Sequence, residues 1–145
     1  NIVMFSKILE DKGATKIFIL TDLDDDQCVT KTRNRISPLQ NHILTISIKK
    51  IEAWFLSDTM AMRKFLNDSS FIYDDPEIIN DPYKEIKSFR ILKTGRDLGD
   101  KKILAKAMIK NGFSIKNAAS HPKCYSAKYF LKHTLKKCGV LTAIK

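Results

Sequence analysis

The order of apolar and polar positions predicts two short strands early in the chain, with a helix between them. Residues 16–20 and 42–48 are apolar, β-rich runs, and the first is typical of a strand that is buried on both faces. Residues 27–36 predict a helix that ends before Pro38. A strand, a helix and a second strand in this order most often form a right-handed βαβ unit with parallel strands. The pattern therefore predicts an α/β fold.

The rest of the chain is predicted to be mostly helical. Asp58 or Ser57 is suited to cap a helix that runs to residue 66, and Gly13 is suited to end a first helix. A stretch rich in Asp, Asn, Ser and Pro, residues 67–82, predicts a loop. Apolar spacing and cap residues predict the remaining helices at 82–92, 100–111 and 126–138.

Length and composition limit the class of protein. The chain has 145 residues, 43% hydrophobic and 29% charged, which suits one globular domain. No apolar run approaches the roughly 20 residues of a bilayer span, and the first residues lack the pattern of a signal peptide. Cys28, Cys124 and Cys138 are widely spaced, which favours buried or half-buried thiols in a reducing compartment. We therefore expect a cytoplasmic protein with no membrane partner.

Two carboxylate residues follow the first predicted strand, and a third begins the helix that follows the second predicted strand. Asp22 and Asp24 share one side of the first strand because side chains alternate along it. The carboxyl ends of parallel strands open on the same edge of a sheet, so we expect Glu52 to join them there. Such a cluster suits Mg²⁺ or Mn²⁺, which take oxygen ligands. Asp26 is a further candidate metal ligand. Asp24 to Asp26 also suit a solvated turn, in which their negative charges interact favourably with the dipole of the next helix.

Three segments resemble the TOPRIM-like superfamily. One feature of this superfamily is an apolar strand followed by a DxD motif, which Asp22 and Asp24 form here. Another is an IEAW motif, which here contains Glu52. The likeness is strongest to uncharacterised bacterial TOPRIM-like domains, which are related to the overcoming-lysogenization-defect nucleases. The segments that carry it are 18–28, 46–58 and, in the last predicted helix, 123–130.

The resemblance implies a Rossmann-like fold, in which helices flank a mostly parallel sheet, and Mg²⁺-dependent phosphodiester chemistry. It implies that Asp22 and Asp24 hold the metal, and that Glu52 is a further ligand or orients a water at the metal. The superfamily also places a glutamate on a strand that would here lie upstream of Asn1, and Glu10 is a poor substitute for it. On this interpretation residues 1–145 are a single TOPRIM-like domain that lacks its first strand.

The charges favour a nucleic-acid partner. The chain carries a net charge of +10, and residues 1–83 hold 10 basic and 13 acidic side chains, whereas residues 84–145 hold 16 and 3. A cationic surface for a polyanion explains this asymmetry, and so does a set of lysine-rich solvated helices. If the partner is DNA or RNA, the candidate phosphate contacts are Lys49, Lys50, Lys101, Lys102 and Lys128.

Two other functions stay open from the sequence. A haloacid-dehalogenase-like phosphatase would use Asp22 and Asp24 as nucleophile and acid, but this chain has Asp26 where that family has a threonine. A catalytically degenerate TOPRIM-like domain would serve as a nucleic-acid-binding or interaction module. Trp54, the only tryptophan, is predicted to belong to the core rather than to stack on a base.

Overall fold

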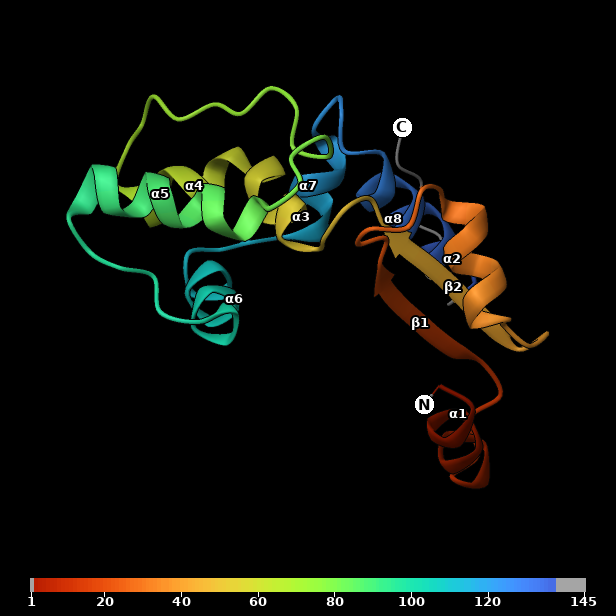
Figure 1. The fold of residues 1–145 in the computed structure, drawn as a ribbon. Helices are drawn as coiled ribbons and strands as arrows, with labels where there is room; N and C mark the ends of the chain where they lie inside the picture. Colours follow the sequence, from red (N-terminus) through yellow and green to blue (C-terminus); the bar gives the residue numbers. More distant parts are fainter. Residues whose placement is uncertain (1, 138–145) are drawn as a thin grey trace.

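The computed structural model of the chain describes residues 2–137 (Figure 1). This part contains two strands and eight helices, so the protein is a mixed α/β structure, as the sequence predicts. The elements in chain order are α1 (Ile2–Asp11), β1 (Ile17–Asp22), α2 (Val29–Ile36), β2 (His42–Ser47), α3 (Glu52–Ser57), α4 (Thr59–Leu66), α5 (Pro82–Thr94), α6 (Lys101–Lys110), α7 (Ile115–Ser120) and α8 (Tyr125–Lys137).

The two strands pair in parallel, and α2 makes the connection between them. The register runs from Ile17 opposite His42 to Asp22 opposite Ser47, so both strands end at the same edge. This confirms the predicted parallel βαβ unit. The described residues hold only these two strands, so the Rossmann-like, TOPRIM-like description of the fold stays a prediction.

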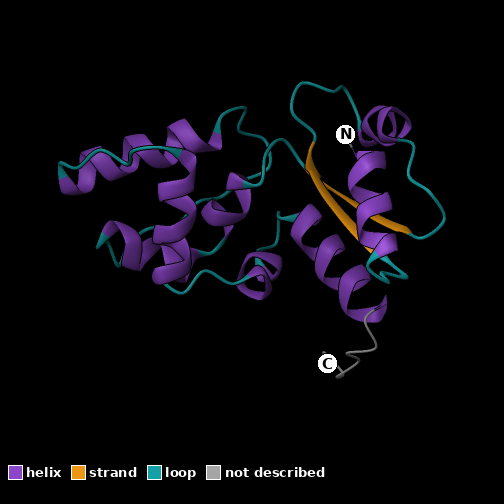
Figure 2. Ribbon diagram, turned by 90° about the horizontal axis from the view of Figure 1, so that it is seen from below, coloured by secondary structure: helices purple, strands orange, loops and turns teal. Residues whose placement is uncertain are grey.

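The elements form two parts that lie side by side (Figures 1 and 2). One part contains the sheet with α1, α2 and α8, and the other contains α3 to α7. Both strand arrows in Figure 1 point toward the helical part, so the carboxyl ends of the strands face it. The core of the helical part contains large side chains from α3 to α6, among them Leu56, Met62, Leu66, Ile86 and Leu104.

Trp54 joins the two parts of the molecule. Its side chain is only 1% exposed and lies in a cluster with residues of α7 and α8, including Ala127. The indole packs against the ring of Phe130, with 5.5 Å between ring centroids, and donates a hydrogen bond of 2.8 Å from Nε1 to Oγ of Ser126. The prediction that Trp54 is a core residue is confirmed.

A carboxylate from the long loop caps α8. Glu77 is buried, and its two oxygens accept hydrogen bonds from the backbone amides of Tyr125, at 2.8 Å, and Ser126, at 2.9 Å. The Ser126 hydroxyl also donates to this carboxylate. A negative charge at this position satisfies free amides and favours the helix dipole. The cap of α8 therefore comes from a distant segment of the chain.

Each predicted helix has a counterpart among the described residues, with ends that differ by a few residues. The structure adds α7, whose six residues were too short to predict from apolar spacing. The predicted end of the last helix at Cys138 and Gly139 lies outside the described residues. No helix in the described part is long and apolar enough to cross a membrane.

The described cysteines differ in their surroundings. Cys28 is exposed, so the expectation of a buried or half-buried thiol is wrong there. Cys124 is buried as expected, and burial raises the pKa of its thiol to about 11. A thiol with this pKa is protonated at neutral pH and suits the core rather than nucleophilic chemistry.

Asp58 connects two helix starts through one buried carboxylate. It is the N-cap of α4, as predicted, and accepts a hydrogen bond of 3.0 Å from the Ala61 amide. The same carboxylate accepts a hydrogen bond of 2.9 Å from the amide of Ser114, which is the N-cap of α7, and another from Asn117 Nδ2. One side chain thereby fixes α7 against α4.

We expect Asp58→Ala to lower the free energy of unfolding by about 2–4 kcal/mol, because it removes a cap and leaves further donors without an acceptor. Asp100→Ala is the matched control, since Asp100 caps α6 on the surface with one hydrogen bond of 2.8 Å to the Ile103 amide. Its expected cost is about 1 kcal/mol. Urea denaturation measures both, and equal losses would contradict the bridging role of Asp58.

Candidate functional site

Asp22 ends β1 at the edge where the carboxyl ends of both strands lie. Its Oδ1 accepts a hydrogen bond of 2.7 Å from the backbone amide of Ile51, in the segment between β2 and α3. Because β1 and β2 are parallel, this short connection brings the start of α3 to the end of β1. The hydrogen bond therefore holds Asp22 beside Glu52, the first residue of α3.

Glu52 is a buried carboxylate with one cationic partner. The residue is only 4% exposed, and its Oε1 lies 2.8 Å from Nζ of Lys101, at the start of α6. The Lys101 side chain is about half exposed, so the ammonium group approaches the carboxylate from the solvent side. A buried charge is costly unless an opposite charge compensates it, and Lys101 supplies that charge.

The pKa values of Asp22 and Lys101 are both shifted by the charge of Glu52. Burial raises the pKa of Asp22; the hydrogen bond from Ile51 opposes this shift, whereas the charges of Glu52 and Asp24 add to it. The hydrogen bond with Glu52 raises the pKa of Lys101, and the charges of Glu52, Asp22 and Asp81 add to the effect. The predicted meeting of Asp22 and Glu52 therefore occurs, with Lys101 beside them.

Two oxygen atoms at this edge have no hydrogen-bond partner among the described residues. They are Oε2 of Glu52 and Oγ of Ser47, both buried. Ser47 is opposite Asp22 in the register, so both residues end their strands at the same level. Buried polar atoms without a partner are rare, and each one calls for an explanation such as a ligand, an ion or water. We call Asp22, Ser47, Glu52 and Lys101 the acidic edge.

The donors of the acidic edge fit a hard divalent cation. Asp22, Ser47 and Glu52 offer only oxygen atoms, which Mg²⁺ and Mn²⁺ prefer over nitrogen or sulfur. Mg²⁺ usually keeps several waters and needs only one or two carboxylates. Sequence reasoning missed Ser47; its place at the end of the second strand, level with Asp22, was the available signal.

The third predicted carboxylate, Asp24, does not complete a preformed cluster. It is exposed, and its backbone lies in the left-handed region with φ of 48°, where its amide donates a hydrogen bond of 2.9 Å to the Lys49 carbonyl. Within residues 2–137, no group of three or more Asp, Glu, His or Cys side chains is arranged to hold a metal ion. Two of the expected three carboxylates therefore converge.

Asp26 serves α2 instead of the acidic edge. Its Oδ2 accepts hydrogen bonds of 2.8 Å from the Thr32 hydroxyl and 2.9 Å from Nη2 of Arg35. These hydrogen bonds, that of Thr32 first, lower the pKa of Asp26. Of the two roles that the sequence allowed, the contacts favour the one at the helix start, and we do not include Asp26 among the metal ligands below.

The predicted phosphate contacts are spread over three elements. Lys49 and Lys50 lie in the segment between β2 and α3, near the acidic edge. Lys101 and Lys102 begin α6, and Lys102 is exposed. Lys128 lies on α8 and donates a hydrogen bond of 2.8 Å to the Pro122 carbonyl. The structure brings one of them, Lys101, into direct contact with a predicted site residue.

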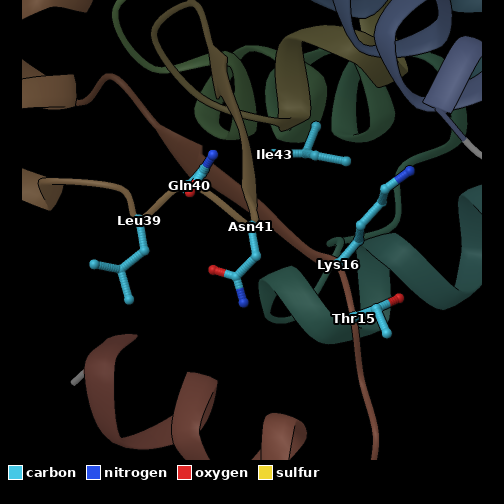
Figure 3. A pocket seen from close by; sticks show the side chains of 6 residues that line it. All are labelled: Thr15, Lys16, Leu39, Gln40, Asn41 and Ile43. Carbon is cyan, nitrogen blue, oxygen red and sulfur yellow. The ribbon is translucent and has the colours of Figure 1, made fainter.

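A separate open pocket of about 620 Å³ lies at the opposite end of the strands. Figure 3 shows the side chains that line it, from the segments that lead into β1 and β2 and from the start of β2. These residues are Thr15, Lys16, Leu39, Gln40, Asn41 and Ile43. None of them is acidic, so this pocket is not the predicted metal site.

The chain was compared with protein-family models, with curated proteins and with solved structures, and no match was found in any of the three. Function is therefore inferred from the geometry and charge of the acidic edge.

Asp22→Asn is expected to stabilise the protein at pH 7 in the presence of a chelator. Because the pKa of Asp22 is raised, the folded state keeps its proton at pH values where the unfolded chain has released it. Stability linked to this group is therefore lost as the pH rises from about 4 through the raised pKa. The asparagine side chain can still accept the hydrogen bond from Ile51 but carries no charge.

The expected result is a Tm a few degrees above that of the native protein at pH 7, with the difference shrinking toward pH 3. Asp25→Asn, at an exposed neighbouring position, is the control and is expected to leave the Tm unchanged. Thermal melts across this pH range measure both variants. A lower Tm for Asp22→Asn at pH 7 would contradict the raised pKa of Asp22 and the burial that causes most of it.

Proposed function

We propose that this chain is a TOPRIM-like domain that hydrolyses phosphodiester bonds in nucleic acid, or performs a related phosphoryl transfer, with Mg²⁺ or Mn²⁺. One observation carries the proposal: the carboxylate of Glu52 is nearly fully buried, and one of its oxygens has no partner among residues 2–137, next to a second carboxylate, Asp22. Paired carboxylates at the carboxyl edge of parallel strands are placed where α/β proteins bind ligands.

In this proposal Asp22 and Glu52 hold the metal ion, and the Ser47 hydroxyl is a further oxygen donor or binds a water of the ion. Asp24 adds a carboxylate from the solvent side. When bound, the ion neutralises charge on the phosphate and activates water for attack on phosphorus. Hydrolysis then breaks one P–O bond and leaves a phosphate monoester and a hydroxyl group.

Lys101 has a role both without and with substrate. Without the metal it supplies the positive charge that the buried Glu52 carboxylate needs, at 2.8 Å. Its side chain is about half exposed, so the ammonium group can turn to a phosphate oxygen once another cation neutralises Glu52. A donor at this place would stabilise the negative charge that develops on the phosphate.

Nucleic acid is the substrate class that the charge supports. The chain has a net charge of +10. Lys49 and Lys50 lie between Ser47 and Glu52 in the chain, and Lys102 follows Lys101 on α6. Lysines that neutralise backbone phosphates release counterions, so binding should weaken steeply with salt. The free thiols of Cys28 and Cys124 are in keeping with the cytoplasm as the proposed location.

The alternative is a domain that binds nucleic acid without cleaving it. Two features favour it: only two carboxylates converge in the part of the chain that the structure describes, and Lys101 already neutralises one of them. Such a module would bind nucleic acid in a chelator and would show no effect of Mg²⁺ on its stability. The two experiments that follow separate it from the nuclease.

Mg²⁺ or Mn²⁺ is expected to raise the Tm of the native protein, because a ligand that binds only the folded state stabilises it. A concentration one hundred times the Kd contributes about 2.7 kcal/mol. Asp22→Asn and Glu52→Gln should each abolish this rise, since each removes a carboxylate of the site. Asp26→Asn is the control: it removes the charge that pairs with Arg35 but should keep the full rise. A rise that survives in Glu52→Gln would contradict the site.

Cleavage of labelled DNA and RNA strands, with Mg²⁺ or Mn²⁺ added, tests the activity directly. We expect Asp22→Asn and Glu52→Gln to lower the cleavage rate by at least about a hundredfold, comparable to the loss of one strong electrostatic contact in a transition state. Lys101→Met should lower kcat more than it raises KM. Cleavage that is unaffected by either carboxylate substitution would exclude the acidic edge as the active site.

A further inference from the structure

An open groove of about 240 Å³ lies between α2 and α8, over β2. Leu44 and Ile46 of β2 form its floor, Arg33 belongs to the wall from α2, and Tyr125 and Tyr129 belong to the wall from α8. We call it the α2–α8 groove. Within the described residues, none of the side chains that line it is acidic.

The two tyrosines of the groove are exposed although their rings lie beside an apolar floor. Tyr125 is 62% exposed and Tyr129 is 48% exposed. They are one helical turn apart, so they lie on the same side of α8. The ring of His133, one turn further, lies 4.0 Å from the ring of Tyr129 between centroids. The result is a row of three rings along one side of the helix.

This row of rings is separate from the core face of α8. The core face contains Ala127 and Phe130, which pack around Trp54. Packing of the core therefore does not explain why Tyr125 and Tyr129 are aromatic. Large exposed aromatic side chains beside a groove are typical of binding surfaces.

Positive charge borders the same rings. Arg33 lies across the groove from the tyrosines, and Nζ of Lys128 lies 5.5 Å from the centroid of the Tyr125 ring. An apolar floor, aromatic rings and cations together suit a ligand that is flat, apolar on its faces and attached to anions. Unpaired nucleobases on a phosphate backbone have this chemistry, because every base can stack on an aromatic ring.

The groove ends next to the acidic edge. Ile48, which also lines the groove, directly follows Ser47, the last residue of β2. The next residue, Lys49, accepts a hydrogen bond of 2.9 Å from the Asp24 amide through its carbonyl. Side chains alternate along β2, so Ser47 and Asp22 face the other side of the sheet from the groove. A strand whose bases occupy the groove would have to pass the end of β2 for its backbone to reach Asp22 and Glu52.

We propose that the α2–α8 groove binds unpaired nucleobases by stacking on Tyr125 and Tyr129, so that single-stranded nucleic acid is the substrate of the acidic edge. In a duplex the bases are stacked on one another and are not available to the rings. The substrate part of this inference rests on the proposed function, whereas binding in the groove needs neither the metal nor cleavage.

The test measures binding in a chelator, so that no cleavage takes place. The probes are a DNA strand, an RNA strand of the same sequence and a DNA duplex, each with one fluorescent 2-aminopurine base. We expect a single strand, of DNA or RNA, to bind more tightly than the duplex, and its fluorescence to fall as the base stacks. The variants are Tyr125→Ala with Tyr129→Ala, and Tyr125→Phe with Tyr129→Phe.

The alanine pair is expected to weaken single-strand binding by about tenfold or more and to remove the fluorescence change, since stacking on one ring is worth about 5- to 150-fold. The phenylalanine pair keeps the rings and should bind like the native protein. Leu92→Ala, at a 78% exposed position on α5, is the control and should change nothing. Thermal melts check that each variant is folded.

Unchanged single-strand binding in the folded alanine pair would overturn the proposal, and so would equal losses in the alanine and phenylalanine pairs. Duplex binding as tight as single-strand binding would also overturn it. If single strands bind as expected and the native protein cuts none of them when Mg²⁺ is added, the proposed nuclease activity fails while the groove proposal stands.

Discussion

The parallel pairing of β1 and β2 is the constraint on which the site depends. Because both strands run the same way, Asp22 and Ser47 end them at one edge, and the segment after β2 returns to that edge. Its amide at Ile51 then binds Asp22, and α3 begins with Glu52 at the same place. An antiparallel pair would separate Asp22 from Glu52 by the length of a strand.

The acidic edge combines features that lower stability with features that suit binding. Two carboxylates of like charge lie close together, one of them is buried, and two oxygen atoms have no partner among the described residues. Lys101 compensates part of this cost from the solvent side. Functional sites often contain groups whose pKa is shifted by burial and by a specific charged partner. Such an arrangement is stabilised most when a ligand binds and compensates the charge. The cost is thus the physical reason to expect a cation and a phosphate there.

Two other buried carboxylates, Asp58 and Glu77, have a structural role and differ from Glu52. Asp58 and Glu77 each accept several hydrogen bonds from helix starts and leave neither oxygen without a partner. Glu77 also holds α8 against the rest of the molecule through Tyr125 and Ser126, and α8 carries one wall of the α2–α8 groove. The loop that contains Glu77 therefore supports the groove, whereas one oxygen of Glu52 has no hydrogen-bond partner among the described residues.

The local elements and the types of residue at the site can be predicted from the amino-acid sequence. Apolar runs marked both strands, and the cap residues Asp58 and Asp100 marked helix starts, because these signals depend on neighbours along the chain. The same pattern placed Asp22 and Glu52 together through the parallel βαβ unit. Three features depend on the folded chain: Lys101 neutralises Glu52, Asp24 stays in solvent, and Glu77 caps α8. Such features either join segments that are dozens of residues apart or depend on the conformation of a loop. Neither long-range contacts nor loop conformation can be read from periodicity or from a motif.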